Sequence, residues 1–264
     1  MVYLKNYSVI LLLLTTLPLL ATARNDDWRL VWSDEFNTEG RLSPSVWNYE
    51  QGYVRNEEAQ WYQPDNAVCK GGFLVIEARK ERNRQNPLYI PGSNDWRKER
   101  EFIEYTSSSV TTAGKKEFLY GRFEVRARIP VAKGAWPAIW TLGSNMEWPS
   151  CGEIDIMEYV GYRPNVTQTS IHTQSYNHVI HTEKTATKNI SNAETEFHIY
   201  GLEWTEDKIT GFVDGIPYFT FLNDKLGDKN TWPFDAPFYL KLNLAIGGNW
   251  GGLMGIDENL CPAV

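Results

Sequence analysis

The sequence predicts an all-β protein made of two packed antiparallel sheets. Apolar and polar residues alternate along several short segments, as they do in strands with one buried face. Outside an apolar run at the N-terminus, no segment shows the period of about 3.6 residues that marks an amphipathic helix. Hydrophobic residues make up 42% of the 264 residues and aromatic residues 14%, enough for a sizeable core. One sandwich of two sheets can bury such a core in a single domain.

The first 23 residues have the features of a secretory signal peptide. Lys5 supplies a positive charge, the apolar run Val9–Leu20 follows, and small residues occupy Ala21–Ala23 before the expected cleavage. The alternative is a membrane anchor, but the apolar run is shorter than the roughly 20 residues that span a bilayer. We therefore expect residues 1–23 to lie outside the fold. Residues 24–264 would form a secreted domain, or a periplasmic one in a bacterium, without membrane attachment.

Two segments in the first half of the domain have strand patterns. Phe73–Ala78 follows a turn of two glycines, and Arg122–Ile129 alternates between polar and apolar residues throughout. Between these segments, Arg79–Arg100 is polar and charged, which predicts one long surface loop.

The second half contains a hairpin signal and a long alternating segment. Asp214-Gly215 is a favoured two-residue turn, and short apolar runs flank it. In Phe238–Ile246 every second residue is large and apolar, while the residues between them include Lys241 and Asn243. This alternation predicts a strand with one face in the core and the other facing polar groups.

Charge and composition exclude nucleic acid as the main partner. The chain has 33 acidic and 26 basic residues and a net charge of −7, so it has no broad basic footprint. Its 11 Trp and 14 Tyr exceed what a core needs, and some of these rings should line a cleft. Cys69, Cys151 and Cys261 allow at most one disulfide, and the sequence does not select the pair. We expect a monomer.

The strongest chemical signal is a group of carboxylates on one expected strand, Glu153, Asp155 and Glu158. In a regular strand Glu153 and Asp155 share one face, whereas Glu158 points to the other. A β-bulge at Ile156-Met157 would return Glu158 to the shared face. Such a row suits a retaining glycosidase, whose nucleophile and acid/base carboxyls are roughly 5–5.5 Å apart. The pattern alone leaves open a solvated acidic strand face or a calcium site.

The chain as a whole resembles glycoside hydrolase family 16, and within it the laminarinase-like endo-β-1,3-glucanases. Gly152–Glu158 has the family's active-site signature in the form that carries the bulge residue. Other matching motifs follow in family order between Trp28 and about Gly252. They are Val31–Asn37, Asn56-Glu57, Gln60–Tyr62, Gly121–Val125, Gly134–Trp140, Tyr200–Trp204, Val213–Gly215 and Leu242–Trp250.

The resemblance implies a β-jelly-roll sandwich with a substrate cleft along its concave face. It also implies endo-acting, retaining hydrolysis of β-1,3 or mixed β-1,3/1,4 glucan such as laminarin, with no required cofactor. Glu153 would be the nucleophile, Asp155 the assisting residue and Glu158 the acid/base. Because both glutamates are present, hydrolysis is favoured over the alternative, a non-catalytic β-glucan-binding protein or an inactive truncated form on the same scaffold.

Tryptophans are the main candidates for binding the polysaccharide. Trp136 and Trp140 lie four residues apart, so both share one strand face and could stack on sugar rings. Core packing beneath the sheet is the alternative for each ring. Trp204 and Trp250 resemble cleft-wall residues of the family, and Asn249 precedes the latter.

Three polar residues complete the expected substrate site. Asn56 and Glu57 resemble family residues near the point of cleavage, with a turn-forming Asn as the alternative. His172 lies where the next strand would return beside Glu158, and a neutral imidazole there could hydrogen-bond that carboxyl. A structural histidine is the alternative.

The resemblance also raises the question of a structural calcium ion. In the family, a convex-side calcium is shared between an N-terminal Glu, a backbone carbonyl and an Asp on the last strand. Glu35 matches the Glu and is the candidate ligand. The sequence ends at Val264, before that last strand, so we expect an incomplete calcium site and a marginally stable sandwich.

Overall fold

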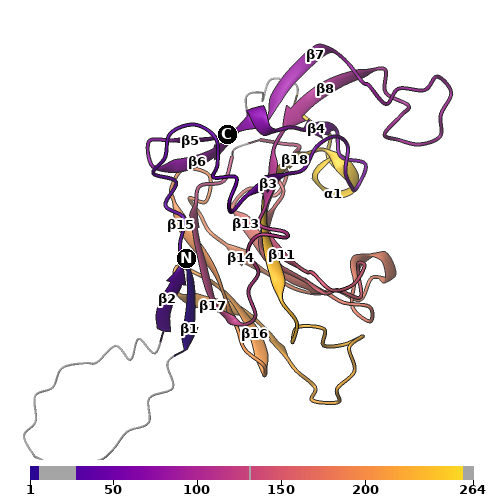
Figure 1. Cartoon of the computed structure of the whole chain (residues 1–264). Coiled ribbons are helices and arrows are strands. Elements are labelled where there is room, and N and C mark those ends of the chain that lie inside the picture. Colours follow the sequence, from indigo (N-terminus) through magenta and orange to yellow (C-terminus); the bar gives the residue numbers. More distant parts are fainter. Residues whose placement is uncertain (6–27, 131, 258–264) are drawn as a thin grey trace, which may run out of the picture.

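The computed structural model describes residues 1–5, 28–130 and 132–257 (Figure 1). Two large antiparallel sheets pack against each other, and two smaller sheets lie at one end of the sandwich. Over these residues the α-helical structure is the single turn α1 (Gly248–Gly251). No described helix has the length and apolar character needed to cross a bilayer. The predicted all-β sandwich is confirmed.

The first large sheet has seven strands, and it carries the predicted carboxylate row. They are β3 (Asn48–Tyr49), β9 (Ser109–Thr111), β11 (Ala135–Gly143), β12 (Glu153–Tyr159), β13 (Val166–His172), β14 (Lys184–Asn189) and β18 (Phe238–Ile246). Their order is β14-β13-β12-β11-β18-β9-β3, and each neighbouring pair is antiparallel. The 3-10 turn η2 (His178–Ile180) lies between β13 and β14.

The second large sheet has six strands. They are β1 (Val2–Lys5), β2 (Trp28–Trp32), β10 (Gly121–Ala127), β15 (His198–Trp204), β16 (Lys208–Val213) and β17 (Ile216–Leu222). Their order is β17-β16-β15-β10-β1-β2, again antiparallel throughout. Asp214 and Gly215 join β16 to β17 with φ angles of 51° and 76°, which confirms the predicted two-residue hairpin turn.

The alternation along β18 separates the core from the opposite face of the seven-stranded sheet. Phe238 and Leu240 are buried in the core between the two large sheets. Lys241 and Asn243 instead contact the Trp140 side chain on the other face. We call this second face, which is turned away from the core, the outer face. The predicted division of β18 into an apolar and a polar face is confirmed.

Two small sheets complete the fold. The strands are β4 (Gln60–Tyr62), β7 (Arg79–Gln85) and β8 (Phe102–Ser107) in one, and β5 (Ala67–Lys70) and β6 (Phe73–Ile76) in the other, with η1 (Pro64–Asn66) before β5. The pair β4–β8 is parallel, which the sequence did not predict. Cys69 on β5 and Cys151 are buried free thiols, and Cys261 lies outside the described residues.

The prediction of one loop over Arg79–Arg100 is wrong in its first part, because Arg79–Gln85 forms β7. This strand is at the edge of the order β4-β8-β7. Charged side chains are common on edge strands, where they discourage pairing with other chains, so β7 has no apolar alternation to detect. Residues 86–101 form the loop between β7 and β8, which projects beyond the sandwich (Figure 1).

The first residues of the full-length chain belong to the six-stranded sheet. β1 lies between β10 and β2, the Val2 side chain is 2% exposed, and the Met1 ammonium donates to the Glu124 carbonyl. In the uncleaved chain, β1 supplies backbone partners to β10 and β2. The expectation that residues 1–23 lie outside the fold of the cleaved protein stays a prediction. The apolar run Val9–Leu20 and the cleavage position lie outside the described residues, and cleavage stays a prediction.

Candidate active site

A β-bulge in β12 brings the three carboxylates to the outer face. The pairing of β12 with β13 shifts between Asp155 and Glu158, so that Ile156 and Met157 together face one partner residue. Ile156 and Met157 are both buried in the core cluster. Burial of these two apolar side chains fixes the extra residue in place and returns Glu158 to the side of Glu153. The predicted bulge is confirmed.

Glu153 lies between two hydrogen-bond donors. The indole Nε1 of Trp148 donates to Glu153 Oε2 at 2.6 Å. Asp155 is 2% exposed, and burial raises its pKa well above the usual range, with the adjacent charge of Glu153 adding to the effect. The raised pKa favours the protonated form of Asp155, which can donate a hydrogen bond to Glu153. Both donors are directed at the carboxylate of Glu153.

Glu158 has surroundings of the opposite kind. Burial raises the pKa of Glu158 well above its usual range, and the nearby Asp155 raises it further. The indole Nε1 of Trp136 donates to Glu158 Oε1 at 3.1 Å and offsets part of this rise. Glu158 is nevertheless partly exposed on the outer face. A protonated carboxyl that is open to the surface is suited to act as a general acid.

His172 contacts Asp155 and not Glu158, which corrects the sequence prediction. Its Nε2 lies 3.2 Å from Asp155 Oδ2. The antiparallel register places His172 opposite Glu153, whereas the bulge places Glu158 opposite Gln168. The imidazole therefore packs beside the assisting carboxyl and not beside the acid/base.

Trp148 is a site residue to which the sequence interpretation gave no role. It lies in the loop before β12, so no strand pattern indicated which way its ring points. In the structure its ring packs against His178 at 5.1 Å and against His172 at 6.4 Å between centroids. The two histidines also contact each other, at 5.2 Å. These rings hold the indole N–H toward Glu153.

The four predicted tryptophans have three different environments. Trp136 and Trp250 are partly exposed and pack edge to face at 5.3 Å, as expected for a substrate wall. Trp140 lies on the predicted face but is only 7% exposed, since Arg55 and Lys241 cover its ring at 5.2 and 4.5 Å. Trp140 therefore lies beneath Arg55 and Lys241 on the outer face, and its ring is not available to stack on a sugar.

Trp204 is not a cleft residue, and that prediction is wrong. Its side chain is 0% exposed, and its Nε1 donates to the Phe234 carbonyl within the core. Trp204 lies on β15 of the six-stranded sheet, so its side of the strand faces the interior and not the outer face of the other sheet.

A buried charged cluster lies on the outer face beside Trp140. Glu50 accepts hydrogen bonds from Lys241 Nζ at 2.7 Å, from Ser109 and from Arg55. Burial lowers the pKa of Lys241 to about 8, with repulsion from Arg55 adding to the effect. Burial would raise the pKa of Glu50, but the two cations lower it to about 2. The sequence placed Lys241 on this face without indicating its partners, which come from distant segments.

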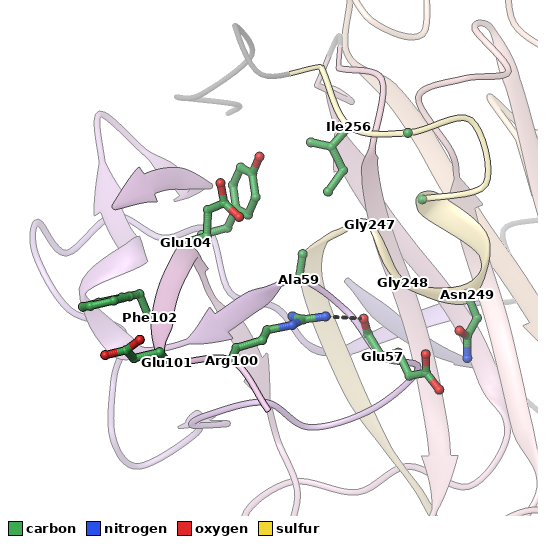
Figure 2. Close-up of a pocket in the computed structure, with 13 residues that line it drawn as sticks. Glu57, Ala59, Arg100, Glu101, Phe102, Glu104, Gly247, Gly248, Asn249 and Ile256 are labelled. Atoms are coloured by element: carbon green, nitrogen blue, oxygen red, sulfur yellow. Dashed lines mark hydrogen bonds between the residues drawn. The ribbon is translucent and has the colours of Figure 1, made fainter. Parts of the chain in front are cut away.

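Asn56 and Glu57 form a strained turn at the edge of the outer face. Both have left-handed backbones, with φ angles of 55° and 54°, so the turn-forming alternative for Asn56 is confirmed. The backbone N–H of Asn249 donates to the backbone carbonyl of Asn56 at 2.9 Å, and this hydrogen bond joins two predicted site segments. Glu57 and Asn249 also line a cavity of about 860 Å³, shown in Figure 2, which none of the three row carboxylates lines.

The structure does not complete a calcium site at Glu35. Among the described residues, the one group of three side chains close enough to share a metal is Glu153, Asp155 and His172, at the carboxylate row itself. Glu35 is exposed and belongs to no such group within the described ranges. Calcium needs six to eight oxygen ligands. The described acidic, histidine and cysteine side chains form no such set at Glu35, and a calcium ion there stays a prediction.

A family model and several known proteins match this chain. The family described as "Glycosyl hydrolases family 16" matches residues 56–258. A beta-glucanase from Rhodothermus marinus is 40% identical over 276 aligned positions, which cover 98% of this chain and 91% of that protein. The laminarinase structure from Rhodothermus marinus has a TM-score of 0.79 at 42% identity and covers 89% of this chain and 93% of that chain.

A second solved structure agrees with these matches. SCLam, a non-specific endo-beta-1,3(4)-glucanase from family GH16, has a TM-score of 0.79 at 42% identity over 89% of this chain and 86% of that chain. The bulged carboxylate row, the β-jelly-roll sandwich and the match over 56–258 all lead to one assignment. This chain belongs to glycoside hydrolase family 16, and it is a glycoside hydrolase of the laminarinase-like type.

Proposed function

We propose that this chain is a secreted, endo-acting and retaining glucanase that cleaves β-1,3 or mixed β-1,3/1,4 glucan. The carrying observation is the contrast between the two glutamates on β12. Glu153 receives hydrogen-bond donors from Trp148 and Asp155, whereas the pKa of Glu158 is raised by burial. A pair of carboxyls with opposed protonation is what double displacement requires. A protein that only binds glucan has no need for this pair.

In the first step, Glu158 donates its proton to the glycosidic oxygen while the Glu153 carboxylate attacks the anomeric carbon. The C–O bond to the leaving sugar breaks, and a covalent glycosyl ester forms on Glu153. In the second step, Glu158, now a carboxylate, takes a proton from water as that water attacks the anomeric carbon, and the ester bond to Glu153 breaks. Two inversions give net retention and restore both glutamates.

The neighbours of the pair have supporting roles. The N–H of Trp148 and the proton of Asp155 orient the Glu153 carboxylate toward the anomeric carbon. Trp136 donates a hydrogen bond to the Glu158 carboxyl and packs against Trp250. A sugar stacked on these two rings would therefore lie next to the acid/base.

Support for β-1,3-linked glucan comes from the relatives, which are named beta-glucanase, laminarinase and non-specific endo-beta-1,3(4)-glucanase. Support for secretion comes from the N-terminal residues 1–23, and we propose that the exported protein acts as a monomer.

A product profile tests the proposal. The purified protein is incubated with laminarin, lichenan, agarose and xyloglucan, and the early products are examined by chromatography and by proton NMR of the new reducing end. We expect oligosaccharides of several lengths from laminarin and lichenan, with the β-anomer formed first. Release of single glucose units only, an α-anomer formed first, or cleavage of agarose alone would contradict the proposal.

A further inference from the structure

The projecting loop of residues 86–101 reaches back to the turn that carries Asn56 and Glu57. Arg100 donates from Nη1 to the Glu58 carbonyl at 3.0 Å and from Nη2 to the Glu57 carbonyl at 3.4 Å. Arg97 donates to the Val54 carbonyl at 3.0 Å. Figure 2 shows the Arg100 side chain extended toward Glu57 along one side of the cavity. A loop more than 40 residues away in sequence thus holds the backbone of the turn at Asn56-Glu57, which we call the Asn56-Glu57 wall.

Aromatic stacking fixes the Arg100 guanidinium in this position. It lies 5.3 Å from the Tyr53 ring and 5.9 Å from the Trp96 ring. Tyr53 in turn packs edge to face with Trp96 at 5.8 Å and with Trp61 at 5.4 Å. The guanidinium thus contacts one ring from the loop and one from the segment before Asn56, and these contacts set its direction before substrate arrives.

The wall needs such support because its backbone is unfavourable. Two consecutive non-glycine residues, Asn56 and Glu57, are left-handed, which costs free energy unless surrounding contacts maintain it. The contacts come from other segments, since Asn249 donates to the Asn56 carbonyl and Arg100 to the two carbonyls that follow. The Asn56 side chain is also held, by a hydrogen bond to the buried Glu58 at 3.3 Å.

We propose that Arg100 is a positioning residue that sets the Asn56-Glu57 wall and thereby the affinity for glucose units bound along it. This inference rests on the proposed function and adds a substrate-affinity determinant outside the outer face. Arg100 makes no contact with Glu153 or Glu158, so it acts on binding and not on bond cleavage. A lysine cannot replace it fully, because one ammonium does not offer two parallel N–H donors and stacks less well on rings.

The test compares Arg100→Lys and Arg100→Gln with matched control variants. Arg126 is the control position, because its guanidinium also stacks on a ring, that of Phe197 at 4.2 Å, but it lies on β10 of the other sheet. KM and kcat are measured with laminarin. Binding of a laminari-oligosaccharide is measured by calorimetry in a Glu153→Gln background, which needs no turnover. Thermal midpoints are recorded for all variants.

For Arg100→Gln we expect KM and the oligosaccharide Kd to rise about tenfold, with kcat within about twofold of the starting protein. Arg100→Lys should give an intermediate rise, and the Arg126 variants should leave KM, Kd and kcat unchanged. Unchanged KM and Kd in folded Arg100→Lys would overturn the inference, as would a fall in kcat alone. If Arg100→Gln does not fold, Arg100→Lys decides. If the starting protein binds oligosaccharide but cleaves no glucan, the proposed function fails while the Kd comparison still tests Arg100.

Discussion

Each of the two glutamates accepts a hydrogen bond from an indole N–H, but their other neighbours differ. Glu153 accepts from Trp148 and from the protonated Asp155, whereas Glu158 accepts from Trp136 in a setting that raises its pKa. The difference is set by donors and burial, since the two side chains are chemically identical. The residues that distinguish acid from nucleophile are therefore the neighbours, and these can be changed one at a time.

Replacing Trp136 by Phe should move the alkaline limit of activity upward. The Trp136 hydrogen bond stabilises the ionised form of Glu158, so its removal raises the pKa of Glu158 further. Glu158 must be protonated to act as the acid, and activity is lost as pH rises through that pKa. We expect the alkaline limb of the kcat/KM profile to shift up by about one pH unit.

Trp250→Phe is the control for this shift. Trp250 packs on the Trp136 ring, but the hydrogen bond to Glu158 comes from Trp136. The control variant should change KM without moving the alkaline limb. A limb that stays in place or moves to lower pH in Trp136→Phe would show that this hydrogen bond does not control Glu158.

At the scale of elements, the bulge in β12 decides which side chains reach the outer face. Deleting Met157 removes the extra residue and gives the regular pairing in which Glu153, Asp155 and Glu158 still share one face. Met157 is buried, so its loss should cost about 2–5 kcal/mol of unfolding free energy. We expect a folded protein that retains part of its activity and cleaves lichenan relatively better than laminarin.

The measurements are circular dichroism, urea unfolding and kcat on both glucans. A fully inactive deletion variant with an unchanged spectrum would show that the bulge sets the position of Glu158, and not merely its face. Met157→Ala is the matched control, since it loses buried volume while keeping the bulge. It should lose stability and retain the substrate preference.

The elements that could be predicted from the sequence are those with one apolar and one polar face. β18 and β10 lie where alternation predicts them, because each buries one side against the core. β7 was missed because an edge strand can be charged on both faces. Trp204 was assigned to the cleft by resemblance to the family alone, and no pattern in the sequence showed that its ring lies in the core.

The partners within the site were harder to predict than its carboxylates. The bulge could be inferred from the spacing in the motif, but it also changes which residue of β13 lies opposite Glu158. The expected His172–Glu158 contact ignored that shift, and the structure has His172 beside Asp155. Trp148, Glu50 and Arg55 come from loops or distant strands, where no periodicity reports the direction of a side chain.

For the whole molecule, β1 gives a test that links export to stability. A protein of residues 24–264 lacks β1, so β2 and β10 each lose their pairing with this strand, while β10 keeps its pairing with β15. The buried Val2 side chain is also absent. Burying one valine contributes about 1.5–3 kcal/mol and each ladder hydrogen bond about 0.5–1.5 kcal/mol. We expect residues 24–264 to be less stable than residues 1–264 by about 2–5 kcal/mol, measured by urea unfolding.

Val2→Asp in the full-length chain is an independent check, since it keeps the length and places a charge in the core position of β1. It should lower the unfolding free energy toward that of residues 24–264. Equal stability of all three proteins would show that β1 contributes nothing to the sheet.

The place of β18 in its sheet has a consequence for how the protein is made. β18 is the last strand in the described chain, yet it pairs with β11 on one side and with β9 on the other. The sheet therefore stays divided into two halves until residues 238–246 have left the ribosome. The two pairings that close it, β18 with β11 and β18 with β9, join segments far apart in sequence. Such non-local closure folds slowly, on a timescale of about milliseconds to seconds. If the chain is exported as proposed, this slow closure keeps it unfolded while it passes through the export channel.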